Sequence, residues 1–168
     1  EHTRQLAIVI GCAESVGALQ SVFDLTVEWA FDRYSFGRSL ASYQALKHRF
    51  ADMKTWLEAC HALADDAAAA VAAGVPPDAA ESTSAAKAYI GEYGGLLIQD
   101  CIQLHGGIGV TYEHDLHLFM RRATANRSSH GSPRRPPTPH RRHRPAAGGR
   151  AVTANRENTE TLDDFRDR

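Results

Sequence analysis

The chain has 168 residues, 43% of them hydrophobic, which is enough for one domain with a core of its own. The N-terminal stretch lacks the pattern of a signal peptide, and no apolar run approaches the ~20 residues of a membrane span, so we expect neither. The net charge of −1 hides a break near Arg127, because residues 1–127 hold 10 basic and 15 acidic side chains and residues 128–168 hold 9 and 5.

Two long amphipathic helices are predicted first along the chain. The apolar face of the first helix consists of Val16, Leu19, Phe23, Val27, Ala30 and Tyr34. Gly37 is expected to end this helix. Ser39 is of a residue type that favours the N-cap of a helix, and we expect a second helix from there to Gly74. Its apolar face consists of Leu46, Phe50, Met53, Leu57, Cys60 and Ala64.

A third helix is predicted for residues 78–105, with an apolar face that includes Leu97 and Cys101. After a glycine-rich stretch, a shorter fourth helix is predicted over residues 113–127. No alternating pattern typical of a β-strand is found in the chain. Long helices with short connections and one apolar face each predict an all-α fold, an antiparallel four-helix bundle over residues 1–130.

Residues 131–168 form a second segment of different composition. This tail is rich in arginine and proline and poor in large apolar residues, so we expect it to be disordered. Its arginines would allow non-specific nucleic-acid binding. Nine arginines without a lysine are also typical of GC-rich coding sequence read in an unselected frame, and we favour that interpretation.

Three cysteines, Cys12, Cys60 and Cys101, lie far apart on helical patterns and form no C-x-x-C pair. This spacing favours reduced core residues over a disulfide or a metal site. Reduced cysteines are usual in cytoplasmic proteins, and we expect that location here.

A first candidate site lies in the stretch "DRYSFGRSLASYQ". Arg33 lies before the turn between the first two helices, the turn exposes the aromatic ring of Phe36, and Gln44 follows in the second helix. A guanidinium beside helix N-terminal amides suits a phosphate group, and an aromatic ring offers a stacking surface for a base. The alternative is an ordinary helical hairpin with solvated arginines.

A second candidate site lies in "QLHGGIG", where three glycines fall within four residues. The residues concerned are Gln103, Leu104, His105, Gly106 and Gly107. Glycines allow a ligand to approach the backbone closely, and a glutamine amide can both donate and accept a hydrogen bond. The alternative is a glycine that ends the third helix, followed by a tight turn.

The order R-x-x-F-G…Q and then Q-x-x-G-G-x-G resembles the C-terminal helical domain of the acyl-CoA dehydrogenases over residues 5–133. The resemblance implies FAD bound across a subunit interface. It implies that Arg33 meets the FAD phosphates beside Phe36 and Gln44, and that residues 103–107 lie along the ADP half. Ser132 is implied as a further cofactor contact.

The resemblance departs from the family at the catalytic base. The family removes the α-proton of an acyl thioester with a glutamate while flavin takes the β-hydride. His130 stands at the corresponding position here, and Ser35 replaces a common glutamine. Some branches lack the glutamate and act as partner subunits in mixed oligomers, and the pattern fits such a subunit, so we expect His130 not to be the working base.

Relative to the family, the chain lacks an N-terminal helical domain and a middle β-domain, so we expect a fragment. The first hypothesis is a domain of an FAD-dependent enzyme that dehydrogenates acyl-CoA thioesters of lipid or steroid type. The family implies oligomers with homologous subunits and electron-transfer flavoprotein as a partner. The second hypothesis is a non-enzymatic helical interaction domain whose basic tail binds nucleic acid or a scaffold.

Overall fold

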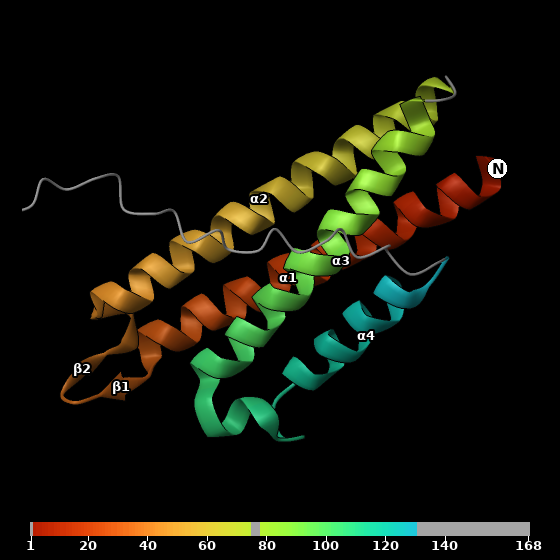
Figure 1. Cartoon of the computed structure of the whole chain (residues 1–168). Helices are drawn as coiled ribbons and strands as arrows, with labels where there is room; N and C mark the ends of the chain where they lie inside the picture. The colour runs from red at the N-terminus through yellow and green to blue at the C-terminus, as the bar shows by residue number, and fades with distance from the viewer. Residues whose placement is uncertain (1, 75–77, 131–168) are drawn as a thin grey trace, which may run out of the picture. The chain divides into compact units, whose positions relative to one another are not determined.

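A computed structural model describes residues 2–74 and 78–130, and the predicted tail lies outside them. Its four α-helices are α1 (His2–Asp32), α2 (Gln44–Ala73), α3 (Asp78–His105) and α4 (Leu116–Ser128). The three long helices run alternately in opposite directions, and α4 turns back along them (Figure 1). The predicted all-α four-helix bundle is confirmed.

Four short elements connect the helices. Strands β1 (Tyr34–Ser35) and β2 (Arg38–Ser39) form a small antiparallel hairpin between α1 and α2, followed by the 3-10 helix η1 (Leu40–Ser42). A second 3-10 helix, η2 (Gly106–Val110), follows α3. The hairpin corrects the expectation that the chain has no strand. Two-residue strands are too short to show the alternation from which a strand is predicted.

Three boundaries differ from the prediction. The first helix ends at Asp32 and not at Gly37, so Tyr34 lies in β1, 67% exposed, and not on the apolar face of α1. Ser39 does not cap α2: it pairs with Tyr34 in the hairpin, and α2 begins five residues later, after Tyr43. The fourth helix starts at Leu116 because the preceding residues form turns, in which His114 Nδ1 accepts a hydrogen bond from the Leu116 amide.

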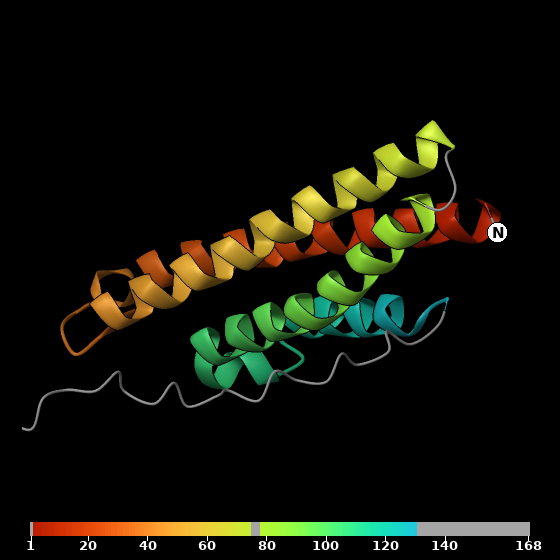
Figure 2. The same ribbon diagram turned by 45° about the horizontal axis from the view of Figure 1, so that its top comes forward.

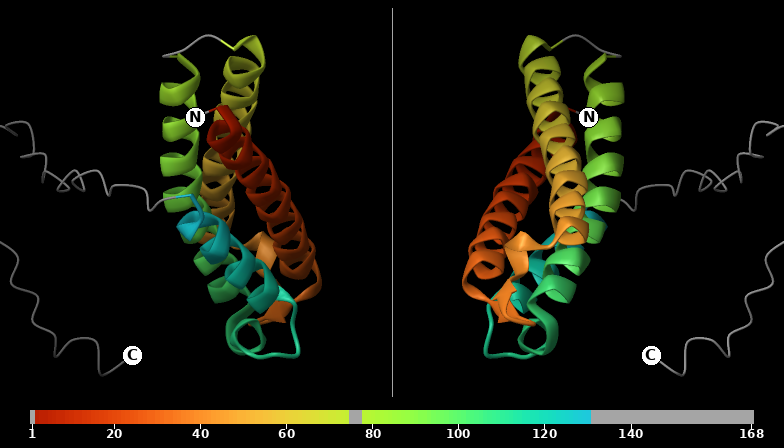
Figure 3. Two further views of the ribbon diagram at one scale, coloured as in Figure 1. Left: turned by 90° about the vertical axis from the view of Figure 1, so that its right-hand side faces the viewer. Right: turned by 90° about the vertical axis from the view of Figure 1, so that its left-hand side faces the viewer.

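The core lies where the apolar faces of the helices meet. α4 packs against α1 and α3, on the side away from α2 (Figures 2 and 3). The largest fully buried apolar side chains are Leu19, Val22, Met53, Leu57, Cys60, Leu97, Ile98, Cys101 and Leu116. The predicted faces of the first three helices supply most of these side chains, which is why the three helices pack with these faces inward.

The first helix is more apolar than the sequence prediction assumed. An 18-residue window of α1 has a mean hydropathy of 1.7, which by length and composition alone suits a membrane span. One third of that window is buried in the bundle, where α1 packs on the other three helices. A core helix of a bundle can have the same length and composition as a membrane span.

The three cysteines are free thiols buried between the helices, as predicted. Burial raises the pKa of Cys60 and of Cys101 to about 12, and it also raises the pKa of Cys12. A thiol that stays protonated at neutral pH is a poor nucleophile. The cysteines therefore contribute to packing.

Candidate functional site

The turn of the hairpin consists of Phe36 and Gly37, both in the left-handed region with φ of 50° and 79°. Positive φ at both central residues is typical of a type I′ hairpin turn. Glycine adopts this conformation freely, but a bulky side chain does so only at a cost. The ring of Phe36 is nevertheless 97% exposed, so the chain gains no packing from it.

Arg33 is an exposed cation at the end of α1. Its backbone carbonyl accepts a hydrogen bond from the Leu40 amide at 2.8 Å, which closes the hairpin against the helix. The guanidinium lies over the Trp29 ring at 5.9 Å. No ion pair holds it within residues 2–74 and 78–130. The charge of Arg33 is thus available to an anion.

The neighbouring polar side chains differ in their availability. Arg38 stacks on Tyr43 with its Cζ atom 3.9 Å from the ring centre, and the Tyr43 hydroxyl donates to the Ser35 carbonyl at 2.7 Å. Gln44 is the exposed first residue of α2, and its Nε2 atom lies 3.3 Å from His48 Nε2. Gln44 therefore lies exposed at the N-terminus of α2, whereas Arg38 is held within the hairpin.

The three positions in the loop after α3 are occupied by glycine for different reasons. Gly106 has a φ of 66°, the left-handed conformation that commonly ends a helix. Gly109 is buried, and a Cβ there would lie 2.5 Å from the Ile102 carbonyl oxygen. Gly107 is exposed, has no positive φ, and a Cβ there would meet nothing within 4 Å. The fold of the chain therefore requires glycine at positions 106 and 109. It does not require glycine at position 107, where contact with a ligand is the remaining reason for this residue type.

His105 is buried, so its ring does not face solvent, in contrast to Arg33, Phe36 and Gln44. The ring is 5% exposed, and Nδ1 lies 2.8 Å from the Cys101 carbonyl oxygen, to which it must donate. Burial lowers the pKa of His105 below its ordinary 6.5. Gln103 is exposed and Leu104 half-buried. A ligand contact from His105 would thus come from its backbone.

The structure brings the two predicted segments together. The hairpin and η2 lie at the same end of the bundle, opposite the N-terminus (Figures 1 and 3). The rings of Trp29 and His105 are stacked, with centroids 5.1 Å apart and planes 20° from parallel. Residues that are about 70 positions apart in the sequence thus form one candidate site.

His130 lies away from this end, after the last turn of α4. It is exposed, with a φ of 57°, and its carbonyl oxygen lies 3.5 Å from Arg4 Nη2. Lys87 Nζ donates to the carbonyl oxygens of Asn126 and Ser129 just before it. These cations satisfy carbonyl groups that the end of a helix leaves free. Ser132 lies outside the described residues.

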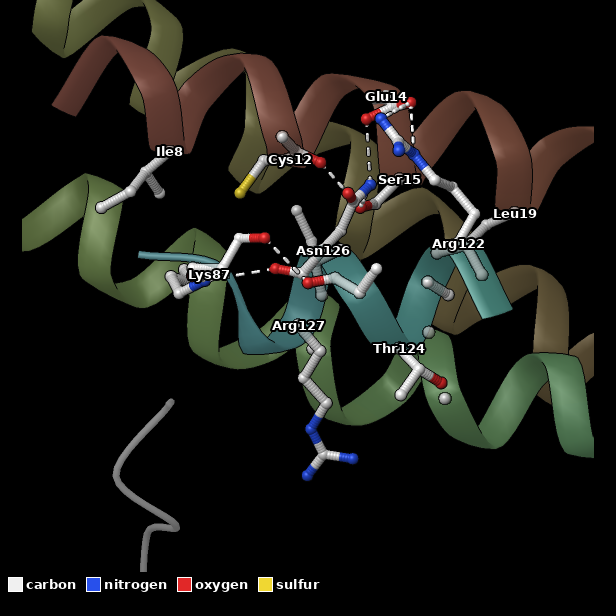
Figure 4. Close-up of a pocket in the computed structure, with 18 of the residues that line it drawn as sticks. Ile8, Cys12, Glu14, Ser15, Leu19, Lys87, Arg122, Thr124, Asn126 and Arg127 are labelled. Carbon is white, nitrogen blue, oxygen red and sulfur yellow. Dashed lines mark hydrogen bonds and ion pairs between the residues drawn. The ribbon is translucent and has the colours of Figure 1, made fainter. Parts of the chain in front are cut away.

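His130 borders a cavity of about 480 Å³ between α1, α3 and α4, shown in Figure 4. Glu14 is the only carboxylate among the described residues that line it. Arg122 Nε and Asn126 Nδ2 donate to this carboxylate at 2.7 and 3.1 Å (Figure 4). The hydrogen bond from Arg122 lowers the pKa of Glu14 most strongly. Glu14 is therefore a weak base.

Sequence reasoning missed three residues that shape these regions: Trp29, Glu14 and Lys87. Trp29 lies four residues before Arg33, and this helical spacing was a usable signal that the two side chains meet. Glu14 and Lys87 act across helices, on residues more than 30 positions away. The periodicity within one helix does not show which residues of another helix it will contact.

Comparisons with known proteins agree on one family. A family model for the acyl-CoA dehydrogenase C-terminal domain matches residues 7–133. The acyl-CoA dehydrogenase IpdE2 of Mycobacterium tuberculosis is 40% identical over 128 residues, which cover 76% of this chain and 38% of that protein.

Two solved structures also share the fold. A chain of the structure described as the electron transferring flavoprotein of Acidaminococcus fermentans has a TM-score of 0.73 at 27% identity, covering 78% of this chain and 34% of that one. PigA with FAD and proline has a TM-score of 0.71 at 28% identity, covering 77% and 33%. The chain spans well under two thirds of each of these proteins.

Proposed function

Because the chain belongs to the acyl-CoA dehydrogenase family, as its C-terminal helical domain, we propose that it completes an FAD site in a larger enzyme. In this proposal, Arg33, Phe36, Gln44 and the segment 103–107 contact the ADP half of FAD, and Ser132 adds a contact. The whole enzyme would dehydrogenate an acyl-CoA thioester between its α and β carbons. When bound, FAD would supply the hydride acceptor.

Phe36 is the observation that carries this proposal. Its ring is 97% exposed on a backbone in the left-handed region. Both features cost free energy within this chain, and such strain is typical of binding sites. A planar ring system stacked on Phe36 would recover the burial that the chain itself does not provide.

The charge and the backbone beside Phe36 also suit a dinucleotide. Arg33 has no acidic partner in the described part of the chain, and a guanidinium binds phosphate oxygens through paired hydrogen bonds. Gly107 leaves its backbone open on the same end of the bundle. These residues therefore fit a pyrophosphate flanked by an aromatic base.

The catalytic base is proposed to come from another subunit. An imidazole at position 130 differs from a carboxylate in reach and charge, and we assign His130 no proton transfer. Glu14 is held ionised by Arg122, which weakens it as a base. A partner subunit that carries the usual glutamate would supply the missing carboxylate.

Assembly into an oligomer is part of the same proposal. Large apolar side chains are exposed on this bundle, among them Ile10 at 68%, Val110 at 76% and Tyr112 at 86%. Exposed apolar surface of this kind is typical of protein interfaces. We propose that homologous subunits cover part of it in the cytoplasm, and that electron-transfer flavoprotein accepts the electrons.

A chimera tests the cofactor contacts. Residues 7–133 would replace the matching C-terminal segment of the Mycobacterium tuberculosis relative, and bound FAD would be measured after desalting. Arg33→Ala is expected to weaken FAD binding by about 1.5–3 kcal/mol, the scale of a hydrogen bond to a charged group. Arg38→Ala removes the same charge from a side chain held on Tyr43 and serves as the control. Equal retention of FAD in the parent and in Arg33→Ala would refute the assignment.

The same chimera tests the base. Assembled with a homologous subunit that has the glutamate, His130→Ala is expected to leave acyl-CoA oxidation nearly unchanged. Loss of turnover in His130→Ala, with the partner's glutamate dispensable, would show that this chain carries the base.

A further inference from the structure

Four side chains at the end of the bundle form a continuous stack. The guanidinium of Arg33 lies 5.9 Å from the Trp29 ring centre, and Trp29 stacks on His105 at 5.1 Å. The next ring, His114, meets His105 in an edge-to-face arrangement with centroids 4.6 Å apart. The stack thus runs from α1 through the end of α3 to the turn before α4.

The rest of the chain gives the hairpin and the glycine loop separate supports. β2 and η1 pack on α1, and η2 packs on α3 and α4. These supports, α1 and α3, also pack directly against each other, and the stack of Trp29 on His105 is the ring contact of that packing that lies beside both site segments. Each ring lies directly beside a predicted site segment, since Trp29 is one helical turn before Arg33 and His105 precedes Gly106.

The orientation of the His105 ring is fixed from two sides. A carbonyl only accepts hydrogen bonds, so Nδ1 carries the proton that it donates to Cys101. Nε2 is buried and has no hydrogen-bond partner among the residues that the structure describes. The backbone of Gly109 lies close to this residue, since a Cβ at Gly109 would be 2.9 Å from His105 Cβ. The hydrogen bond to Cys101 and the stack on Trp29 together hold the neutral His105 ring in one orientation.

We propose that the Trp29–His105 stack is a joint that sets the position of the Arg33 hairpin relative to the glycine loop, with the ring of His105 as a positioning group and any ligand contact of this residue left to its backbone. This inference rests on the proposed function for its purpose, because one dinucleotide must meet both segments at once. A binding site of two separate segments needs fixed spacing to gain from both contacts.

Spin labels measure that spacing directly in the full chain without flavin. Labels at Tyr34→Cys and Gly107→Cys are both exposed, and the native cysteines are buried. Replacing His105 by Gln keeps a hydrogen-bond donor and removes the ring stack. We expect the distribution of distances between the labels to broaden in this variant.

Two further variants test whether the broadening comes from loss of the Trp29–His105 stack or from a general loss of stability. His105→Phe keeps a flat ring on Trp29 and is expected to restore the narrow distribution. Tyr93→Leu removes comparable ring contacts with Trp56 and Tyr89 elsewhere in the bundle, and the distribution should stay narrow. Equal widths in the parent and in His105→Gln, or equal broadening in Tyr93→Leu, would overturn the joint.

Flavin retention links the joint to the proposed function. In the chimera, His105→Gln should bind FAD about three- to ten-fold more weakly than His105→Phe, the scale of one aromatic pair. Equal FAD affinity in these two variants would overturn the positioning role. If Arg33→Ala leaves FAD retention unchanged while the distances still broaden in His105→Gln, the cofactor assignment fails and the joint stands.

Discussion

Two glycines of η2 give a matched pair of substitutions. At Gly109 an added methyl group would lie 2.5 Å from the Ile102 carbonyl oxygen and 2.9 Å from His105 Cβ. Both obstacles belong to the backbone or are fixed to it, so the loop itself must move. Forcing extra atoms into a packed site costs about 1–3 kcal/mol, and Gly109→Ala should lie in the upper half of that range.

Gly107→Ala is the control for this substitution. The added methyl group meets nothing within 4 Å, and the backbone has no positive φ. The variant should be as stable as the parent or more stable by roughly 0.4–1 kcal/mol, because alanine restricts the unfolded chain. Its effect should instead appear in the chimera as weaker FAD binding.

Urea unfolding followed by circular dichroism measures the two free energies. The slope of the free energy of unfolding against urea concentration should be the same in all variants, so that the midpoint alone reports stability. A Gly109→Ala variant as stable as Gly107→Ala would show that the loop relaxes freely, and the packing account of Gly109 would be wrong.

Two other predictions concern protonation. His105 has a lowered pKa when folded, so the unfolded chain takes up its proton first; stability should be complete above about pH 6.5 and fall as the pH drops below it. His105→Phe should reduce this fall in urea unfolding measured at several pH values, and an unchanged slope would contradict the assignment. The buried thiols of Cys12, Cys60 and Cys101 should resist iodoacetamide until urea unfolds the chain. Rapid labelling of the native chain would contradict their burial.

The sequence by itself determined the helices and the two motifs. Apolar residues such as Leu57 and Leu97 recur at helical spacing and are fully buried in the structure. Gly74 ends α2 in the left-handed conformation, as glycine at a helix end predicts. These features depend on local periodicity and backbone freedom, which one chain segment carries without its neighbours. The motif around Arg33 and Gly106 likewise needs only residue order.

Tertiary structure alone decided which residues of the motifs face outward. His105 and Gly107 are two positions apart, yet the first is stacked under Trp29 and the second is open. Gly109 is glycine because a carbonyl of the preceding helix lies against it, and no local pattern reveals that contact. Burial and stacking depend on the packing of α1 against the end of α3, where groups distant in sequence meet. In the packed structure, Gly106 forms the turn, Gly109 makes the close contact and Gly107 leaves its backbone open.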